Sequence, residues 1–216
     1  MKYNTFIFDL DGTLLDTLQD LANSVNYALS QHGMPTHSID DVRRFVGNGV
    51  RVLMERAIPE GAANPAFDAT FATFRQHYMQ HSLDTTRPYD GIPELIHELK
   101  ARGCHMAVVS NKMMAATQEL VRHFFPEIEV AIGEHEAAGI RKKPAPDTVF
   151  EALRQLGVPH TSSLTPLTSH LLPLLSMWAT ATSTWRRHAI AVCRVSACCG
   201  AFATNPFYWN TGLRPS

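Results

Sequence analysis

The chain has 216 residues, a formal net charge of −1 and 45% hydrophobic residues, which suits one medium domain or a core domain with an insert. The near-zero charge argues against a dedicated nucleic-acid binder, and no apolar run reaches the roughly 18 residues of a membrane-spanning helix. The N-terminus has no signal-peptide pattern, and four cysteines do not make a disulfide framework. We therefore expect a cytoplasmic protein that binds neither nucleic acid nor membrane.

The first half of the chain combines one strand with a long helical stretch. A short apolar run at residues 5–8 ends in D-L-D-G, which predicts a buried strand followed by a turn. Apolar residues then recur at helical spacing. This spacing predicts helices at 16–31, 38–44, 50–57 and 67–81. The segment Gly47-Asn48-Gly49 separates the second helix from the third.

Strand and helix patterns alternate after Pro88. Strands are predicted at 104–109 and 128–132, and helices at 93–102, 113–124 and 146–156. This alternation predicts an α/β fold with a Rossmann-like parallel sheet. We expect a core made of residues 1–15 and 88–160, an inserted all-helical cap at 16–87, and a tail at 161–216 whose fold the pattern does not predict.

Four chemically active side chains are predicted at the carboxyl edge of this sheet, where open α/β sheets bind their ligands. Asp9 and Asp11 are two residues apart at a strand end, so both carboxylates can face one side. Ser110 closes the second strand, and Lys143 precedes a helix start. These groups suit phosphoryl transfer. One carboxylate attacks phosphorus to form an aspartyl-phosphate, the other exchanges protons, and the remaining groups neutralise charge.

Three sequence motifs point to one family. The segment from Phe6 to Leu14, hydrophobic residues followed by D-x-D-G-T, resembles the first motif of the haloacid dehalogenase-like phosphatases. The segments from Val108 to Asn111 and from Lys143 to Asp147 resemble their second and third motifs. The order matches, with a helical segment between the first two motifs. The resemblance covers residues 1 to about 160.

This resemblance implies a role for each candidate residue. Asp9 would be the nucleophile and Asp11 the general acid and base. Ser110 would hold a phosphoryl oxygen, and Lys143 would stabilise negative charge. The resemblance also implies a magnesium ion (Mg²⁺), bound by the Asp9 carboxylate and the backbone carbonyl of Asp11.

Two further segments narrow the resemblance. Residues 45–50 (F-V-G-N-G-V) and 110–112 (S-N-K) look most like phosphoglycolate phosphatases. The implied partner is a small phosphorylated metabolite, with 2-phosphoglycolate as the first choice. The candidate substrate-binding residues are Gly12, Thr13, Asn111, Gly47 and Asn48. We interpret Lys112 and Lys142 as solvent-exposed charges rather than catalytic groups.

The fourth motif of the family, G-D-S/T-x-x-D, is missing from the tail. All 20 acidic residues lie at or before Glu151. The first 151 residues carry 14 basic side chains and a net charge of −6, whereas the last 65 carry five arginines and no acid. An acid-free run of this length has odds on the order of one in ten thousand. The metal-binding acids of that motif therefore cannot be assigned to this chain.

The genetic code suggests why the motif is missing. A shifted frame takes the third base of each codon together with the first two bases of the next. In this frame the codons for Met177, Trp178 and Ala179 permit only valine followed by glycine. The following shifted codons permit D-S-D-V-D, which completes the fourth motif, and those for residues 199–204 permit W-G-F-R-D. The latter resembles a later segment of phosphoglycolate phosphatases. We infer that the coding frame is lost between about residues 160 and 177.

Three functions are compatible with the sequence. The first is a magnesium-dependent phosphatase of a small phosphate monoester, acting through an aspartyl-phosphate and impaired by loss of the fourth motif. The second is a β-phosphoglucomutase-like mutase, which shares the core and cap but needs a sugar bisphosphate and releases little phosphate. The third is an inactive frameshifted product or a non-catalytic binding protein.

Overall fold

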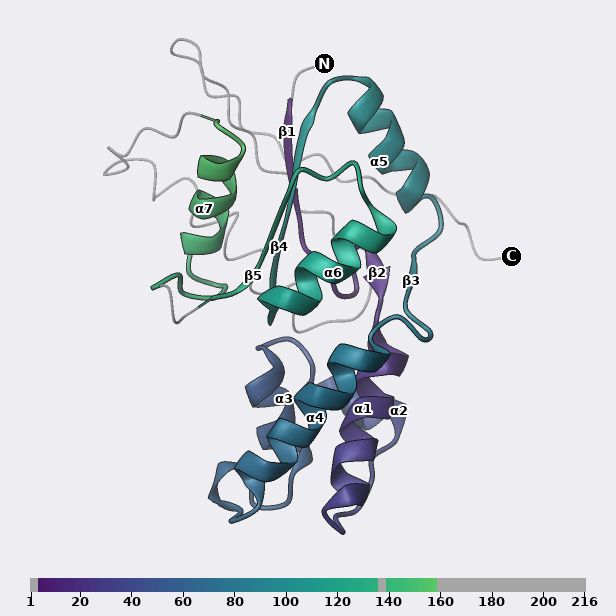
Figure 1. Cartoon of the computed structure of the whole chain (residues 1–216), viewed down its shortest axis with the longest axis vertical. Coiled ribbons are helices and arrows are strands. Elements are labelled where there is room, and N and C mark those ends of the chain that lie inside the picture. Colours follow the sequence, from purple (N-terminus) through teal and green to yellow (C-terminus); the bar gives the residue numbers. More distant parts are fainter. Residues whose placement is uncertain (1–3, 136–138, 159–216) are drawn as a thin grey trace.

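A computed structural model describes residues 4–135 and 139–158, arranged in two lobes (Figure 1). The sheet lobe contains β1 (Thr5–Phe8), β4 (His105–Met113), β5 (Val130–Glu134), α5 (Ile92–Ala101), α6 (Met114–Phe124) and α7 (Asp147–Gln155). The helical lobe contains α1 (Leu18–Gln31), α2 (Ile39–Phe45), α3 (Val50–Ala57), the 3-10 turn η1 (Gly61–Ala63) and α4 (Phe67–His81). The tail at 161–216, with the inferred loss of frame, lies outside the described residues.

The sheet lobe is a three-layer α/β structure, as the alternating pattern predicts. Its strands are parallel in the order β1-β4-β5. Side chains alternate between the two faces of a strand, so Phe8 and Val108 pack with α5 and α6 while Ile7 and Val109 pack with α7. Figure 1 shows α7 separated by the sheet from α5 and α6. The predicted parallel sheet is therefore confirmed.

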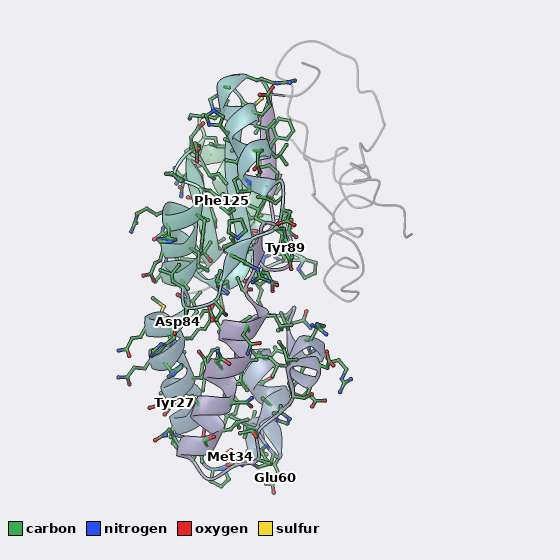
Figure 2. All side chains as sticks on the ribbon, turned by 90° about the vertical axis from the view of Figure 1, so that its right-hand side faces the viewer. Tyr27, Met34, Glu60, Asp84, Tyr89 and Phe125 are labelled. Atoms are coloured by element: carbon green, nitrogen blue, oxygen red, sulfur yellow. The ribbon has the colours of Figure 1, made fainter. Side chains whose placement is uncertain are left out.

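The helical lobe forms around one apolar cluster. The apolar stripe of α1, which includes Leu21, Val25 and Leu29, is buried with Phe74 and Tyr78 of α4. Figure 2 labels Tyr27, Met34 and Glu60 on this lobe and Phe125 on the sheet lobe. Within the two described ranges, no helix combines the length and the apolar character that crossing a membrane requires.

A pair of two-residue strands joins the lobes. Leu15–Asp16 (β2) pairs antiparallel with Arg87–Pro88 (β3), and both predicted core–cap boundaries fall within this pair. The buried carboxylate of Asp20 accepts hydrogen bonds from the backbone N–H groups of Thr85 and Thr86, at 3.0 and 2.9 Å, and from both hydroxyls. Asp20 thus clamps the returning chain to the start of α1. The domain limits themselves stay a prediction.

Strand β4 is longer than its sequence pattern predicts. The pattern ends at residue 109, but the strand continues through Met113, with a register shift against β5 between Val109 and Met113. Gly133 of β5 lies against the backbone that leads from this shifted segment into α6. A Cβ atom at this position would lie 2.6 Å from the Met114 Cα and 2.7 Å from the Lys112 carbonyl oxygen. The close approach therefore requires glycine.

Gly133→Ala should lower the free energy of unfolding by about 3 kcal/mol, near the upper end for overpacking, because the clashing atoms belong to the backbone. Gly103→Ala is the control, since no atom lies within 4 Å of its added Cβ and its φ is +71°. In that control the free energy of unfolding should fall by only about 1 kcal/mol, because alanine is strained in the left-handed conformation. Urea unfolding followed by far-UV circular dichroism measures both. A loss at Gly133 no greater than that at Gly103 would contradict this packing.

Candidate active site

The site lies at the carboxyl ends of β1 and β4, facing the helical lobe. Asp9 directly follows β1, and the Lys143 Nζ, from the loop before α7, lies 2.7 Å from the Asp9 Oδ1. The Leu10 backbone N–H donates to the same oxygen at 2.8 Å, and the Lys143 Nζ donates to the Val109 carbonyl at 3.1 Å. The Lys143 side chain is only 8% exposed. One oxygen of the candidate nucleophile is thus fixed by a buried cation and a backbone donor.

Asn111 holds the loop that carries Lys143. The Asn111 Nδ2 donates to the Lys143 carbonyl oxygen at 3.1 Å, and the Lys143 N–H donates to the Asn111 Oδ1 at 2.8 Å. Because both polar ends of this buried amide face the Lys143 backbone, they fix the lysine relative to the end of β4. The predicted contact of Asn111 with substrate stays a prediction.

The second candidate carboxylate pairs with a different lysine. The Asp11 Oδ1 accepts hydrogen bonds from the Lys112 Nζ at 2.8 Å and from the Thr17 Oγ1 at 2.6 Å. The Lys112 side chain is 2% exposed, so its interpretation as a solvent-exposed charge is wrong. The extension of β4 past residue 109 brings this lysine into the interior, which the local sequence pattern does not reveal.

The pair changes the acidity of both groups. Burial alone would raise the pKa of Asp11, but the ammonium of Lys112 and the Thr17 hydroxyl outweigh it, and the pKa is lowered. Burial likewise opposes the charge of Lys112, yet Asp11 raises the pKa of this lysine above its ordinary value. The pair is therefore ionised at neutral pH.

Ser110 and the turn after β1 complete the predicted set. Ser110 is buried, and its Oγ accepts a hydrogen bond from the Lys112 N–H at 3.2 Å. Gly12 has a φ of +73° and donates its N–H to the Leu15 carbonyl at 2.8 Å. Thr13 is buried in the same turn. The turn thereby carries the chain away from Asp11 toward β2.

The loop between α2 and α3 reaches the site from the helical lobe. Gly47 and Gly49 have φ values of 128° and 87°, and Asn48 between them is exposed. A Cβ atom at Gly49 would lie 3.4 Å from the Asn111 carbonyl oxygen and 3.9 Å from the Glu134 Oε2. The loop therefore covers the ends of β4 and β5. Whether Gly47 and Asn48 bind substrate stays a prediction.

The oxygen atoms present fit a magnesium ion with few protein ligands. Among the described residues, no hydrogen bond is donated to the Asp9 Oδ2 or to the Asp11 carbonyl oxygen. Magnesium binds oxygen and often uses one or two carboxylates with water and substrate phosphate. No group of three or more His, Cys, Asp or Glu that could hold a metal occurs in the described ranges. The assignment of Asp9 and Asp11 as metal ligands stays a prediction.

Known proteins of one family match the same part of the chain. A family model of haloacid dehalogenase-like hydrolases matches residues 6–165. A phosphoglycolate phosphatase from Aquifex aeolicus is 31% identical over 153 residues, which cover 70% of this chain and 69% of the relative. An N-acetylmuramic acid 6-phosphate phosphatase from Pseudomonas aeruginosa is 29% identical, over 73% of this chain and 70% of the relative.

A solved structure agrees with these matches. It is that of a candidate phosphoglycolate phosphatase from Lactobacillus delbrueckii subsp. bulgaricus, with a TM-score of 0.67 and 37% identity over 74% of this chain and 75% of that one. The family match, the fold and the three motifs around Asp9, Ser110 and Lys143 coincide. The chain therefore belongs to the haloacid dehalogenase-like hydrolase family.

Proposed function

We propose that the chain descends from a magnesium-dependent phosphatase of a small phosphate monoester, with 2-phosphoglycolate as the first choice, and that it retains at most weak activity. The observation that carries this proposal is the pairing of two adjacent strand-end carboxylates with two separate buried lysines, Asp9 with Lys143 and Asp11 with Lys112. Two carboxylates in different environments can divide the roles of nucleophile and proton carrier.

In the first step, the Asp9 Oδ2 attacks phosphorus and the bond to the substrate oxygen breaks. Asp11 must first take up a proton, against the lowered pKa that Lys112 imposes on it. It then gives this proton to the leaving oxygen, so an alcohol departs and an aspartyl-phosphate remains. In the second step, water attacks the same phosphorus while Asp11 takes one of its protons. This step releases phosphate and regenerates the Asp9 carboxylate.

The surrounding groups offset negative charge during both steps. The Lys143 ammonium lies 2.7 Å from the Asp9 Oδ1, where it can attract the phosphoryl oxygens as well. Ser110 supplies a hydroxyl from β4. The Asp9 carboxylate and the Asp11 carbonyl would hold magnesium, which supplies further charge neutralisation when bound.

The proposed impairment follows from the tail. The family match ends at residue 165, and no acid occurs after Glu151. The chain therefore cannot offer the acids of the fourth motif, and magnesium would be held by fewer protein oxygens than a chain with that motif provides.

A substrate panel tests the proposed activity. Purified chain is incubated with 2-phosphoglycolate, N-acetylmuramic acid 6-phosphate and glucose 1-phosphate, with magnesium or with EDTA, and released phosphate is measured. We expect release from 2-phosphoglycolate that EDTA abolishes, at a rate below the ordinary range of roughly 1–10³ per second. Conversion of glucose 1-phosphate that depends on a sugar bisphosphate and releases little phosphate would favour the mutase instead. A rate within the ordinary range would contradict the impairment.

A further inference from the structure

Two histidines on α4 lie one helical turn apart with their rings in contact. His77 and His81 are four positions apart, and residues at this spacing share one face of a helix. Their ring centres are 4.2 Å apart, and the two ring planes are inclined by 24°. Both side chains are partly exposed. Neither residue takes part in the proposed phosphoryl transfer.

The Nδ1 atom of each ring has a hydrogen-bond partner. The His81 Nδ1 lies 2.8 Å from the Asp84 Oδ2. An ionised carboxylate only accepts hydrogen bonds, so the His81 Nδ1 carries the proton and the Nε2 of the neutral ring has a lone pair. The His77 Nδ1 lies 3.0 Å from the Ser24 Oγ, which can accept in the same way. Within residues 4–135 and 139–158, neither Nε2 atom forms a hydrogen bond.

This arrangement is the one that metal-binding histidines commonly have. A ligating histidine donates its second ring N–H to a carboxylate or another acceptor, which fixes the orientation of the ring and raises the basicity of the ligating nitrogen. Asp84 is that acceptor for His81, and Ser24 can serve His77. The two Nε2 atoms are therefore the available ligands of this pair.

The surroundings support the rings and leave the pair accessible to an ion from solvent. Tyr27 of α1 stacks on His77 with ring centres 4.0 Å apart, so the His77 ring lies between those of Tyr27 and His81. The side chains of His81 and Asp84 are 43% and 56% exposed. Figure 2 labels Tyr27 and Asp84 on the same side of the molecule. The Asp84 carboxylate adds a negative charge that attracts a cation.

We propose that His77 and His81 form a two-histidine site for a divalent late transition metal such as zinc, with water completing the coordination. Imidazole nitrogen suits zinc, copper and nickel, whereas magnesium prefers oxygen. Histidines four apart on a helix are a known zinc-binding pair. Asp84 acts through His81 and is not itself a ligand, which agrees with the lack of a three-residue metal cluster among the described residues.

Binding requires a small change in the rings. Each lone pair lies in the plane of its ring, so the two planes must incline by more than the present 24° to meet at one ion. The terminal side-chain torsion of histidine is soft enough for this movement. Both ligands lie on the last turn of α4, which ends at His81. The ion would therefore clamp that turn and have no part in the phosphatase chemistry.

The test follows the histidine ring nitrogens of the full chain by nitrogen-15 NMR while zinc chloride is added. Excess magnesium chloride is present to occupy oxygen sites. The tail contains further histidines and cysteines, so the number of bound zinc ions alone does not locate the site. The signals of His77 and His81 are identified by their loss in His77→Gln and His81→Gln. We expect both Nε2 signals to move together over one range of zinc concentration, with both Nδ1 atoms still protonated.

Variants distinguish a shared ion from two separate ones. In His77→Gln the His81 signal should no longer respond over that range, and the reverse should hold in His81→Gln. Asp84→Asn keeps both ligands but weakens the acceptor, so the response should need about 10-fold more zinc. His97→Gln is the control, because this histidine of α5 is 80% exposed and lies outside the pair, and it should leave the response unchanged.

Two results would overturn the inference. The first is that neither Nε2 signal moves when zinc is in several-fold excess over the chain. The second is an unchanged His81 response in His77→Gln, because the two histidines would then bind separately. The test requires no turnover. If the signals move as expected and the chain releases no phosphate, the proposed function fails and the metal site stands.

Discussion

Restoring the reading frame after about residue 160 should raise magnesium-dependent phosphate release from 2-phosphoglycolate at least about 100-fold over the chain as written. Removing one group that stabilises charge in a transition state costs about 10²–10³ in rate, and the chain lacks every acid of the fourth motif. The restored gene carries one added nucleotide between codons 160 and 177, so that each later codon begins at the present third base. Initial rates of phosphate release at saturating substrate compare the two proteins.

Two controls accompany the restored protein. Three added nucleotides at the same point preserve the present frame and should leave the rate low, which separates the frame from the insertion itself. EDTA should abolish the gain, because the restored acids would act by holding magnesium. A restored protein as slow as the chain as written would show that the missing motif does not limit the rate.

Asp9→Asn should abolish phosphate release in both the chain as written and the restored protein. An amide oxygen cannot form the aspartyl-phosphate, while its similar shape can still accept the Leu10 N–H bond. Mass spectrometry of acid-quenched protein should find phosphate on the peptide that contains Asp9, and not in the variant. Asp68→Asn, at an exposed position on α4, is the matched control and should leave the rate unchanged. Equal turnover in Asp9→Asn and in the control would refute the nucleophile.

The fold could be predicted closely where local pattern decides it. The predicted helix at 50–57 coincides with α3, and the predicted strand at 5–8 coincides with β1, because apolar spacing marks both. The two-residue strands β2 and β3 carry no periodic pattern. Next to them, Asp20 binds residues that lie 65 and 66 positions later in the chain, a contact that spacing does not reveal.

The site could be predicted only in part for the same reason. Motif order indicated that Asp9 and Lys143 belong to one site, and the structure brings them together. The pairing of Asp11 with Lys112 spans 101 positions and depends on a register shift at the end of β4. Two carboxylates at one strand end were the available signal, since two neighbouring negative charges call for compensating cations.

The most direct test of lost function in this family member is the coding DNA from codon 155 to the end. We predict that the bases in the shifted frame spell V-G-D-S-D-V-D across codons 177–184 and W-G-F-R-D across codons 199–204. That result would identify the parent as a phosphatase with a complete fourth motif. If the bases spell other residues where the code permits a choice, the tail is a segment of different origin. The loss of frame would then be contradicted, and the metal site would need another ligand.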